Sequence, residues 1–191
     1  MKRIGLFGGS FDPVHLGHLL VAQAAREEFG IDRVFFIPAA RSPFKPDSVP
    51  AEDHHREQLL RLALSGKANF EIDLQELQRG GTSYTIDTVN AYRSRYPDAK
   101  LFWLIGADHV PTLDKWRDAD ELASKVEFLI IPRPGEADEQ APEPFVIHRL
   151  RGFPLGVSSS QIRDRVKAGL PVDQLVSPSV SEAIRNKGLY L

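Results

Sequence analysis

The stretch GGSFDPVHLGH runs from Gly8 to His18, between a short apolar segment and a segment with helical periodicity, Leu16 to Phe29. We expect it to join a strand to a helix. Consecutive glycines let the backbone turn tightly and approach a ligand closely. The free N–H groups of the helix N-terminus would attract an anion. His15 and His18 would share one face of the first turn, with Gly17 leaving room for a bulky anion, so the junction predicts two imidazoles directed at one phosphate.

Two other interpretations of the histidines stay open. A zinc site would need more ligands than these two, and the sequence has neither a third ligand beside them nor an HExxH pattern. Alternatively, the stretch is a helix cap with two satisfied histidines. Neither the dinucleotide fingerprint GxGxxG nor the P-loop pattern GxxxxGK[ST] is present.

Apolar segments alternate with helical ones along the rest of the chain. Strands are expected at 4–7, 33–38, 70–73, 101–105, 126–131 and 145–150, and helices at 16–29, 53–65, 85–96, 159–168 and 179–187, with one or two short helices within 108–124. Continuous apolar strands predict a parallel sheet covered on both faces. We therefore expect an α/β fold, a Rossmann-like doubly wound parallel sheet with helices on both faces and a small C-terminal helical part. Residues 1–191 would form a single domain, with a core over 1–150 and the C-terminal helical part over 151–191.

The composition excludes several classes of protein. The 191 residues carry a formal net charge of -2, whereas a general nucleic-acid binder usually has a basic excess. There is no cysteine, hence no disulfide framework and no cysteine-based zinc site. No apolar run reaches the length of about 18 residues that suggests a membrane helix, and the N-terminus has the pattern of a strand rather than a signal peptide. We expect a cytoplasmic protein with no nucleic-acid or membrane partner.

The segment VSSSQIRDRV, residues 157–166, has the pattern of a second helix start that could bind an anion. Ser158 or Ser159 would be the N-cap. Arg163, one turn into the helix, could bind a β- or γ-phosphate through two N–H groups. The alternative is a capped surface helix with solvated arginines, and Arg165 is expected to be solvated in either case.

The segment GADHVPTLDKW, residues 106–116, follows the apolar run LFWLI. Asp108 could accept hydrogen bonds from ribose hydroxyls, or it could be an N-cap. Trp116 could stack on an aromatic ring or belong to the core. Residues 8–18, 106–116 and 157–163 are all expected at the carboxyl end of the sheet, where ligands of such folds bind.

The stretch GGSFDPVHLGH resembles the [HT]xGH signature of the nucleotidylyltransferase superfamily. With the other motifs, the chain resembles the bacterial nicotinate-nucleotide adenylyltransferase family from Arg3 to the terminal GLYL. The resemblance implies transfer of AMP from ATP to nicotinate mononucleotide, giving deamido-NAD and pyrophosphate in NAD biosynthesis, with Mg²⁺ bound mainly through the ATP phosphates. In the family's [IV]SSTxIR motif, Ser160 replaces the threonine and keeps the hydroxyl. Phe44 stands where the family often has histidine.

The resemblance also implies roles for individual residues. The catalytic residues would be His15, His18 and Arg163. ATP would be bound by these residues together with Gly8, Gly9, Ser10, Phe11, Gly17, Gly106, Asp108, Ser159 and Ser160. Nicotinate mononucleotide would be bound by Ser10, Lys45, Tyr84, Thr85, Trp116 and Arg133, with its carboxylate at the helix start within TSYTIDT, residues 82–88. No protein ligand of the metal is expected.

Two rival functions can be compared with this one. Phosphopantetheine adenylyltransferase shares GxFDPxxxGH, but it usually has threonine at the position of His15 and lacks TSYTIDT. A nucleotide-binding regulatory module without turnover is disfavoured because His15, His18 and Arg163 are all present. The sequence does not fix the oligomeric state, for which a homodimer is one candidate.

Overall fold

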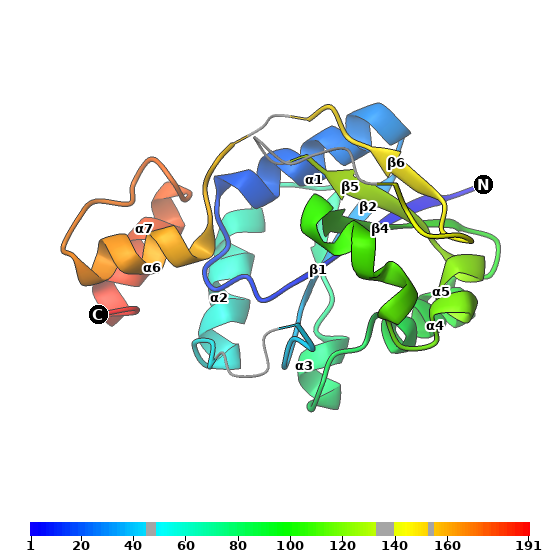
Figure 1. Ribbon diagram of the computed structural model, residues 1–191. Helices are drawn as coiled ribbons and strands as arrows, with labels where there is room; N and C mark the ends of the chain where they lie inside the picture. The colour runs from blue at the N-terminus through cyan, green and yellow to red at the C-terminus, as the bar shows by residue number, and fades with distance from the viewer. Residues whose placement is uncertain (45–48, 133–139, 153–154) are drawn as a thin grey trace.

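The computed structural model describes residues 1–44, 49–132, 140–152 and 155–191 (Figure 1). Its strands are β1 (Arg3–Gly9), β2 (Arg33–Pro38), β3 (Phe70–Ile72), β4 (Lys100–Gly106), β5 (Glu127–Ile131) and β6 (Ile147–Arg149). Its helices are α1 (Leu16–Phe29), α2 (Asp53–Leu64), α3 (Gln75–Arg79), α4 (Thr85–Arg95), the 3₁₀ helix η1 (Ala107–Lys115), α5 (Ala119–Lys125), α6 (Ser159–Lys167) and α7 (Pro178–Lys187).

The strands form one parallel sheet in the order β3-β2-β1-β4-β5-β6. This is the order of a doubly wound Rossmann-like sheet, so the predicted fold class is confirmed. The strand order reverses between β1 and β4, and the segments that follow both strands carry predicted site residues. Such a reversal point opens a crevice beyond the carboxyl ends of the strands.

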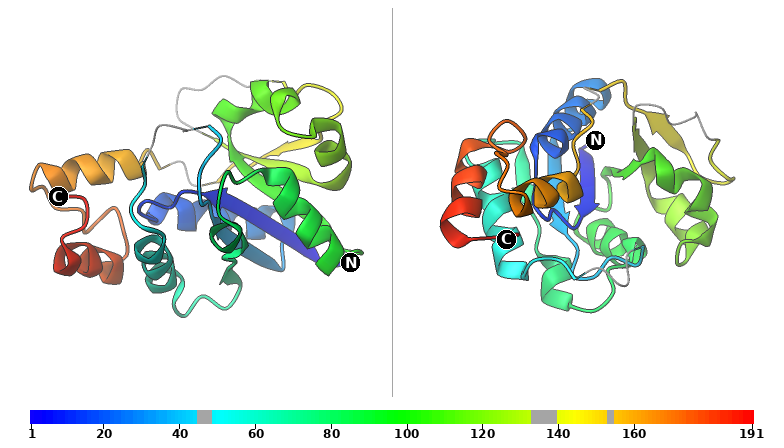
Figure 2. Two further views of the ribbon diagram at one scale, coloured as in Figure 1. Left: turned by 90° about the horizontal axis from the view of Figure 1, so that it is seen from below. Right: turned by 60° about the vertical axis from the view of Figure 1, so that its left-hand side comes forward.

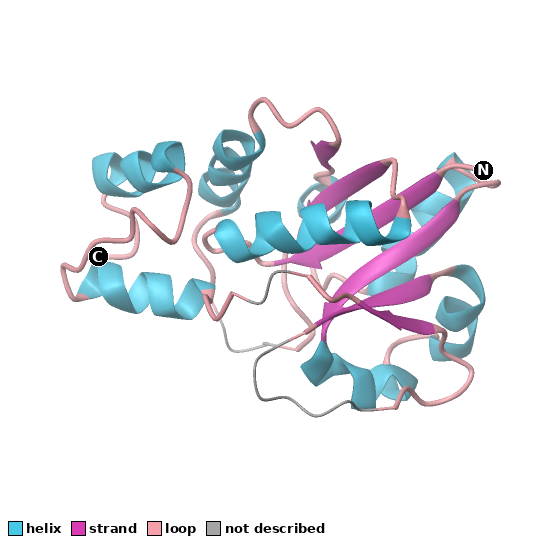
Figure 3. Ribbon diagram, turned by 90° about the horizontal axis from the view of Figure 1, so that it is seen from above, coloured by secondary structure: helices cyan, strands magenta, loops and turns pink. Residues whose placement is uncertain are grey.

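Two apolar clusters fill the two faces of the sheet, as the continuous apolar strands predicted. Alternate side chains of β1 enter opposite clusters, since Phe7 packs on one face while Ile4 and Leu6 pack on the other. One cluster includes residues of α1, α2, α6 and α7, and the other includes residues of α4, η1 and α5. Figure 3 shows α1 lying across one face of the sheet.

The two C-terminal helices lie beside α2 at one end of the molecule (Figures 1 and 2). Ile162 of α6 and Val180 and Ile184 of α7 are buried in the same cluster as Phe7 and Leu59. The Ser179 hydroxyl also donates to the Leu62 carbonyl. The C-terminal segment is therefore packed onto the sheet-bearing part of the chain.

Element boundaries agree closely with the pattern, with one omission. Helix α1 and strand β2 have the expected bounds, and Gly30 ends α1 in the left-handed region at φ 57°. Helix α3 was not expected, because a five-residue helix is too short for its periodicity to be recognised. Among the described residues, no helix has the length and apolar composition needed to cross a bilayer.

Candidate functional site

Gly8 and Gly9 do not form the tight turn that the sequence suggested. Both belong to β1, in register with Ile37 and Pro38 of β2. A Cβ on Gly8 would lie 2.7 Å from Cζ2 of Trp103, a distance that real Cβ atoms do not tolerate. Gly8 is therefore needed for packing between neighbouring strands. Neither Gly8 nor Gly9 lines the cleft that contains His15, His18 and Arg163.

The chain turns at Phe11 instead. Phe11 is buried and has a φ of 48°, a left-handed conformation that is rare for a non-glycine residue. Its ring lies 5.0 Å from the ring of His18 and 5.5 Å from that of Phe7. Such strain persists only where the surroundings over-determine it, and it commonly marks a functional segment.

The two histidines stand together at the start of α1, as predicted. His15 is the N-cap residue, and its ring stacks on that of His18 with 3.7 Å between the ring centroids. The backbone N–H of His15 donates to Nδ1 of His18 over 3.2 Å. Because Nδ1 accepts this bond, the proton of a neutral His18 is assigned to Nε2. A Cβ on Gly17 would lie 3.0 Å from Nδ1 of His15, so the absence of a side chain at Gly17 leaves room for that ring.

Both imidazoles are neutral near pH 7. Burial lowers the pKa of His15 to about 4. Burial and the neighbouring His15 lower the pKa of His18 well below its usual range. The pair can therefore offer N–H donors to an anion without carrying a positive charge.

The N-terminus of α1 has fewer free amides than expected. The Leu16 amide donates to the Leu175 carbonyl over 2.9 Å, and the His18 amide donates to the His15 carbonyl over 3.0 Å. The prediction that this helix start offers its free N–H groups to an anion is therefore wrong for these two amides. The imidazole N–H groups are therefore better candidates than these two amides as donors to an anion.

Helix α6 brings the second predicted motif to the same place. Ser158 is the N-cap, and its side chain accepts from the Gln161 amide. The Ser159 hydroxyl donates to the Pro13 carbonyl over 2.9 Å, which ties the first turn of α6 to the loop after β1. Arg163 donates to the Asp12 carbonyl over 2.7 Å and to the Ser160 hydroxyl over 3.2 Å.

Asp12 was not singled out from the sequence, although it belongs to the quoted motif. Its carboxylate accepts from the Tyr190 hydroxyl over 2.9 Å and from the Ala51 amide over 3.3 Å. The Arg163 guanidinium lies 3.8 Å from the same carboxylate. Asp12 therefore links the loop after β1 to α6 and to the C-terminal segment. No sequence signal indicates a partner 178 residues away.

A cleft of about 580 Å³, which we call the large cleft, opens between these segments. Its wall includes nine of the predicted ATP-binding residues: Ser10, Phe11, His15, Gly17, His18, Gly106, Ser159, Ser160 and Arg163. Asp108 is exposed and does not line it. Asp108 lies within η1, whose N-cap is Gly106, so the alternative role of Asp108 as an N-cap is wrong.

A second, smaller cavity of about 50 Å³, which we call the aromatic cavity, lies beside the start of α4. It brings together the predicted Tyr84, Thr85 and Trp116 with Pro43, Phe44 and Arg117. Tyr84 is the N-cap of α4 and Thr85 is its first residue. The Phe44 ring lies 5.1 Å from the Trp116 ring, and the Arg117 guanidinium lies over the Tyr84 ring at 4.6 Å. Arg117 was missed, because a charged residue after Trp116 carries no sequence signal of its own.

The remaining predicted residues cannot be assigned to either site. Lys45 and Arg133 lie outside the described residues. Over the described ranges, no group of three or more histidine, aspartate and glutamate side chains is arranged to hold a metal ion.

Comparison with known proteins identifies the family. Residues 6–165 match the family model described as cytidylyltransferase-like. A probable nicotinate-nucleotide adenylyltransferase of Opitutus terrae is 44% identical over 98% of this chain and 97% of its own length. The nicotinate-nucleotide adenylyltransferase of Bacillus subtilis is 40% identical over 100% of this chain and 99% of its own.

Solved structures agree on the fold. The nicotinic acid mononucleotide adenylyltransferase of Plasmodium falciparum, solved in complex with NaAD, superposes with a TM-score of 0.80 at 19% identity and covers 100% of this chain and 98% of that one. At 19% identity, this structural similarity shows that the fold is shared and does not show the function. The sequence relatives carry the assignment further: with full-length identities of 40% and 44% to such enzymes, the chain belongs to the nicotinate-nucleotide adenylyltransferase family, within the cytidylyltransferase-like group.

Proposed function

We propose that this chain transfers the AMP of ATP to nicotinate mononucleotide, forming deamido-NAD and pyrophosphate. The observation that carries the proposal is the meeting of His15, His18 and Arg163 in the wall of one cleft, although they come from opposite ends of the chain. The relatives' names support the choice of substrates. No covalent enzyme intermediate is needed for this reaction.

ATP would occupy the large cleft. Its phosphates would face Nε2 of His18, the Arg163 guanidinium and the first turn of α6, where Ser159 and Ser160 line the wall. Charge-assisted hydrogen bonds from an arginine to phosphate are stronger than neutral ones. Donors fixed before the reaction stabilise the negative charge that develops on the phosphoryl oxygens.

Nicotinate mononucleotide would place its pyridine ring in the aromatic cavity. Trp116 offers a face for stacking, and its Nε1 is buried without a hydrogen-bond partner among the described atoms. The carboxylate would lie at the N-terminus of α4, at Tyr84 and Thr85, where the helix dipole favours negative charge. Lys45 and Arg133 remain predicted contacts of this substrate.

The reaction would be a direct in-line displacement. An oxygen of the mononucleotide phosphate attacks the α-phosphorus of ATP and forms the new P–O bond, while the bond to the bridging oxygen of the β-phosphate breaks and its electron pair leaves with pyrophosphate. The attacking phosphate is largely dianionic at neutral pH, because its second pKa is about 6. No general base is therefore required, and the neutral imidazoles act only as donors.

Magnesium fits the same proposal as an ion bound mainly through the ATP phosphates. The carboxylate of Asp12 lies at the cleft, but it already accepts from Tyr190 and Ala51. When bound, the ion would neutralise phosphate charge and orient the triphosphate. The residues of this chain would bind and orient the two nucleotides and exclude water.

Pyrophosphate release tests the proposal. The purified protein is mixed with ATP, Mg²⁺ and, in separate reactions, nicotinate mononucleotide, phosphopantetheine or no acceptor. We expect release only with the mononucleotide. Release only with phosphopantetheine would assign a phosphopantetheine adenylyltransferase activity instead. Binding of ATP without release in any reaction would favour a nucleotide-binding regulatory module.

A further inference from the structure

Arg56 is the largest fully buried side chain among the described residues and plays no part in the proposed chemistry. Its side chain has 0% exposure, in the first turns of α2. A buried guanidinium carries a large desolvation cost unless its N–H groups are paired. What it pairs with therefore indicates why the chain keeps a cation there.

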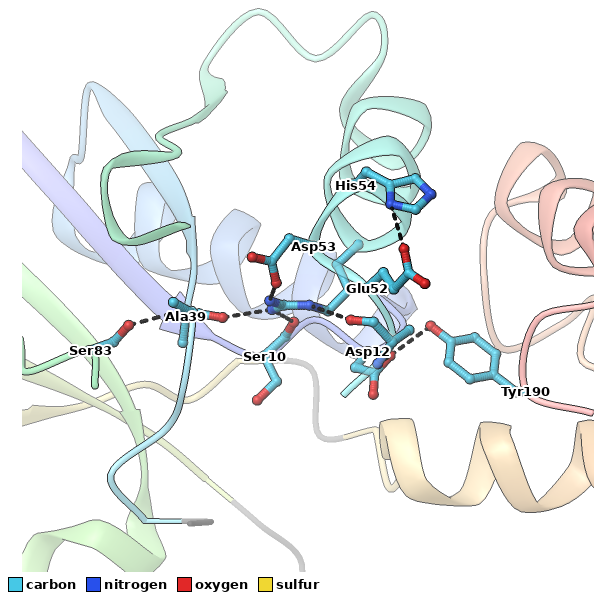
Figure 4. Close-up of polar contacts among 11 residues, drawn as sticks. Ser10, Asp12, Ala39, Glu52, Asp53, His54, Ser83 and Tyr190 are labelled. Atoms are coloured by element: carbon cyan, nitrogen blue, oxygen red, sulfur yellow. Dashed lines mark hydrogen bonds and ion pairs between the residues drawn. The ribbon is translucent and has the colours of Figure 1, made fainter. Parts of the chain in front are cut away.

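The partners of Arg56 are mainly backbone carbonyls of segments that position the substrate sites (Figure 4). Nη1 donates to the Ser10 carbonyl over 2.8 Å and to the Ala39 carbonyl over 2.7 Å. Nε donates to the Ala51 carbonyl over 3.1 Å, and Nη2 donates to the Asp53 carboxylate over 2.5 Å. One planar fork thus joins the segment after β1, the segment after β2 and the segment leading into α2.

The Ser10 carbonyl belongs to the peptide unit that precedes Phe11. Phe11 has a left-handed φ of 48°, and rotation of this peptide unit would relieve the backbone strain of that conformation. By holding the carbonyl, Arg56 keeps Phe11 in that conformation. The Phe11 ring then packs against the ring of His18. The guanidinium is therefore two steps from the proposed donor. Arg56 does not itself line the cleft, but its partner Ser10 does.

The Ala39 carbonyl belongs to a segment that is hydrogen-bonded to the edge of the aromatic cavity, the proposed site of the nicotinate ring. The next residue, Ala40, donates its amide to the Ser83 hydroxyl over 3.0 Å, and the Ser83 amide donates to the Arg41 carbonyl over 2.9 Å. Ser83 directly precedes Tyr84, the N-cap of α4 at the aromatic cavity. The same guanidinium is thus connected to the wall of each site.

We propose that Arg56 is a positioning residue that fixes the loop carrying Phe11 and the edge of the aromatic cavity relative to one another. This inference rests on the proposed function, because it concerns the alignment of two substrates in one reaction. A lysine cannot replace Arg56, since a single ammonium cannot span three carbonyls and a carboxylate in the geometry of a planar fork.

The test compares Arg56→Lys and Arg56→Met with Arg61→Lys, a control on the same helix whose arginine is exposed and paired with Glu57. We expect kcat with both substrates saturating to fall by about 30- to 100-fold for the Arg56 variants, because a displacement of about 1 Å can cost about 100-fold in rate. The dissociation constant of each nucleotide alone, measured by calorimetry, should change less than about fivefold, since Arg56 does not line either site. Arg61→Lys should match the parent in both measurements.

Circular dichroism and thermal unfolding are recorded for every variant, and kcat is measured well below the unfolding temperature. A folded Arg56→Lys variant with parental kcat would overturn the proposal. So would a fall in kcat fully explained by weaker binding of one nucleotide, or failure of both variants to fold, which would assign Arg56 to fold stability alone. A parent protein that releases no pyrophosphate would refute the proposed function instead, so the two failures are distinguishable.

Discussion

The large cleft draws its walls from both ends of the chain, whereas the aromatic cavity is built from short segments in its first two thirds. Most of the cleft wall comes from residues within 7–24 and 155–163, and the cavity is formed around residues 43–44, 84–85 and 116–117. The cleft measures about 580 Å³ and the cavity about 50 Å³. The cavity is too small for a whole nucleotide.

The two regions also differ in how they would recognise a ligand. In the cleft, imidazole, hydroxyl and guanidinium groups converge, as binding of a polyphosphate requires. In the cavity, three aromatic rings surround a helix start. The cleft should therefore control the chemical step, and the cavity should control which mononucleotide is accepted.

The largest effect is expected for His18→Ala. Losing the Nε2–H donor should lower kcat by about 100- to 1,000-fold, as removal of one oxyanion donor does in other enzymes. Steady-state pyrophosphate release measures this, with the exposed His54→Ala as control. A folded His18→Ala variant with near-parental kcat would remove His18 from the reacting phosphate.

The aromatic cavity should prefer the acid over the amide mononucleotide. The dipole of α4 favours a carboxylate by about 0.3–1 kcal/mol, and an amide facing amide donors would leave groups unpaired at about 1–3 kcal/mol. Together they predict a preference of about 10- to 1,000-fold in kcat/KM for nicotinate over nicotinamide mononucleotide. Trp116→Phe should affect both substrates alike, because both rings stack. Equal kcat/KM values for the parent would refute the placement of the carboxylate at Tyr84 and Thr85.

Arg163→Ala should weaken binding of the ligand of the large cleft, ATP, without weakening binding of nicotinate mononucleotide. Hydrogen bonds to charged groups contribute about 1.5–3 kcal/mol, so the dissociation constant for ATP should rise by about 10- to 100-fold. Binding of nicotinate mononucleotide should change little. Isothermal titration of each ligand measures both constants. Arg165→Ala is the matched control, since Arg165 lies on the same helix and donates to the Pro171 carbonyl; equal losses for both ligands would contradict the division.

The last prediction concerns the pH dependence of stability, to which the cleft should contribute. The pKa of His15 is about 4 in the folded protein and 6.5 in the reference state. Between these values the unfolded chain binds the additional proton, so the free energy of unfolding falls as the pH is lowered from 6.5 to 4. The slope is about 1.4 kcal/mol per pH unit for one such proton. Urea unfolding at several pH values measures it. His15→Gln should flatten the slope, and an unchanged slope would show that His15 is not buried in its neutral form.

The parallel sheet and most helices could be predicted because they depend on local patterns. The apolar runs of β2 and β4 and the glycine that ends α1 are visible within a few residues of sequence. The histidine pair could be predicted for the same reason, since both residues lie on one turn. At these places the local spacing of residue types was sufficient to predict the structure.

Features that depend on distant partners could not be predicted in this way. Gly8 is required by Trp103, which is remote in sequence but adjacent in the sheet. Arg56 lies in the polar segment DHHREQ, and nothing near it indicates the carbonyls of Ser10 and Ala39. The Leu16 amide at the start of α1 looked free because its acceptor, the Leu175 carbonyl, is remote in sequence.

The contact between Asp12 and Tyr190 has a consequence for how the protein is made. A ribosome synthesises the loop after β1 early and Tyr190 178 residues after Asp12. During translation the six described strands leave the ribosome before α6 and α7, because they all lie in the first 149 residues. Asp12 can then contact the Ala51 amide early, but it acquires Arg163 and Tyr190 only after α6 and the C-terminal segment have been made. All the strands of the sheet are thus synthesised before the wall of the large cleft is complete.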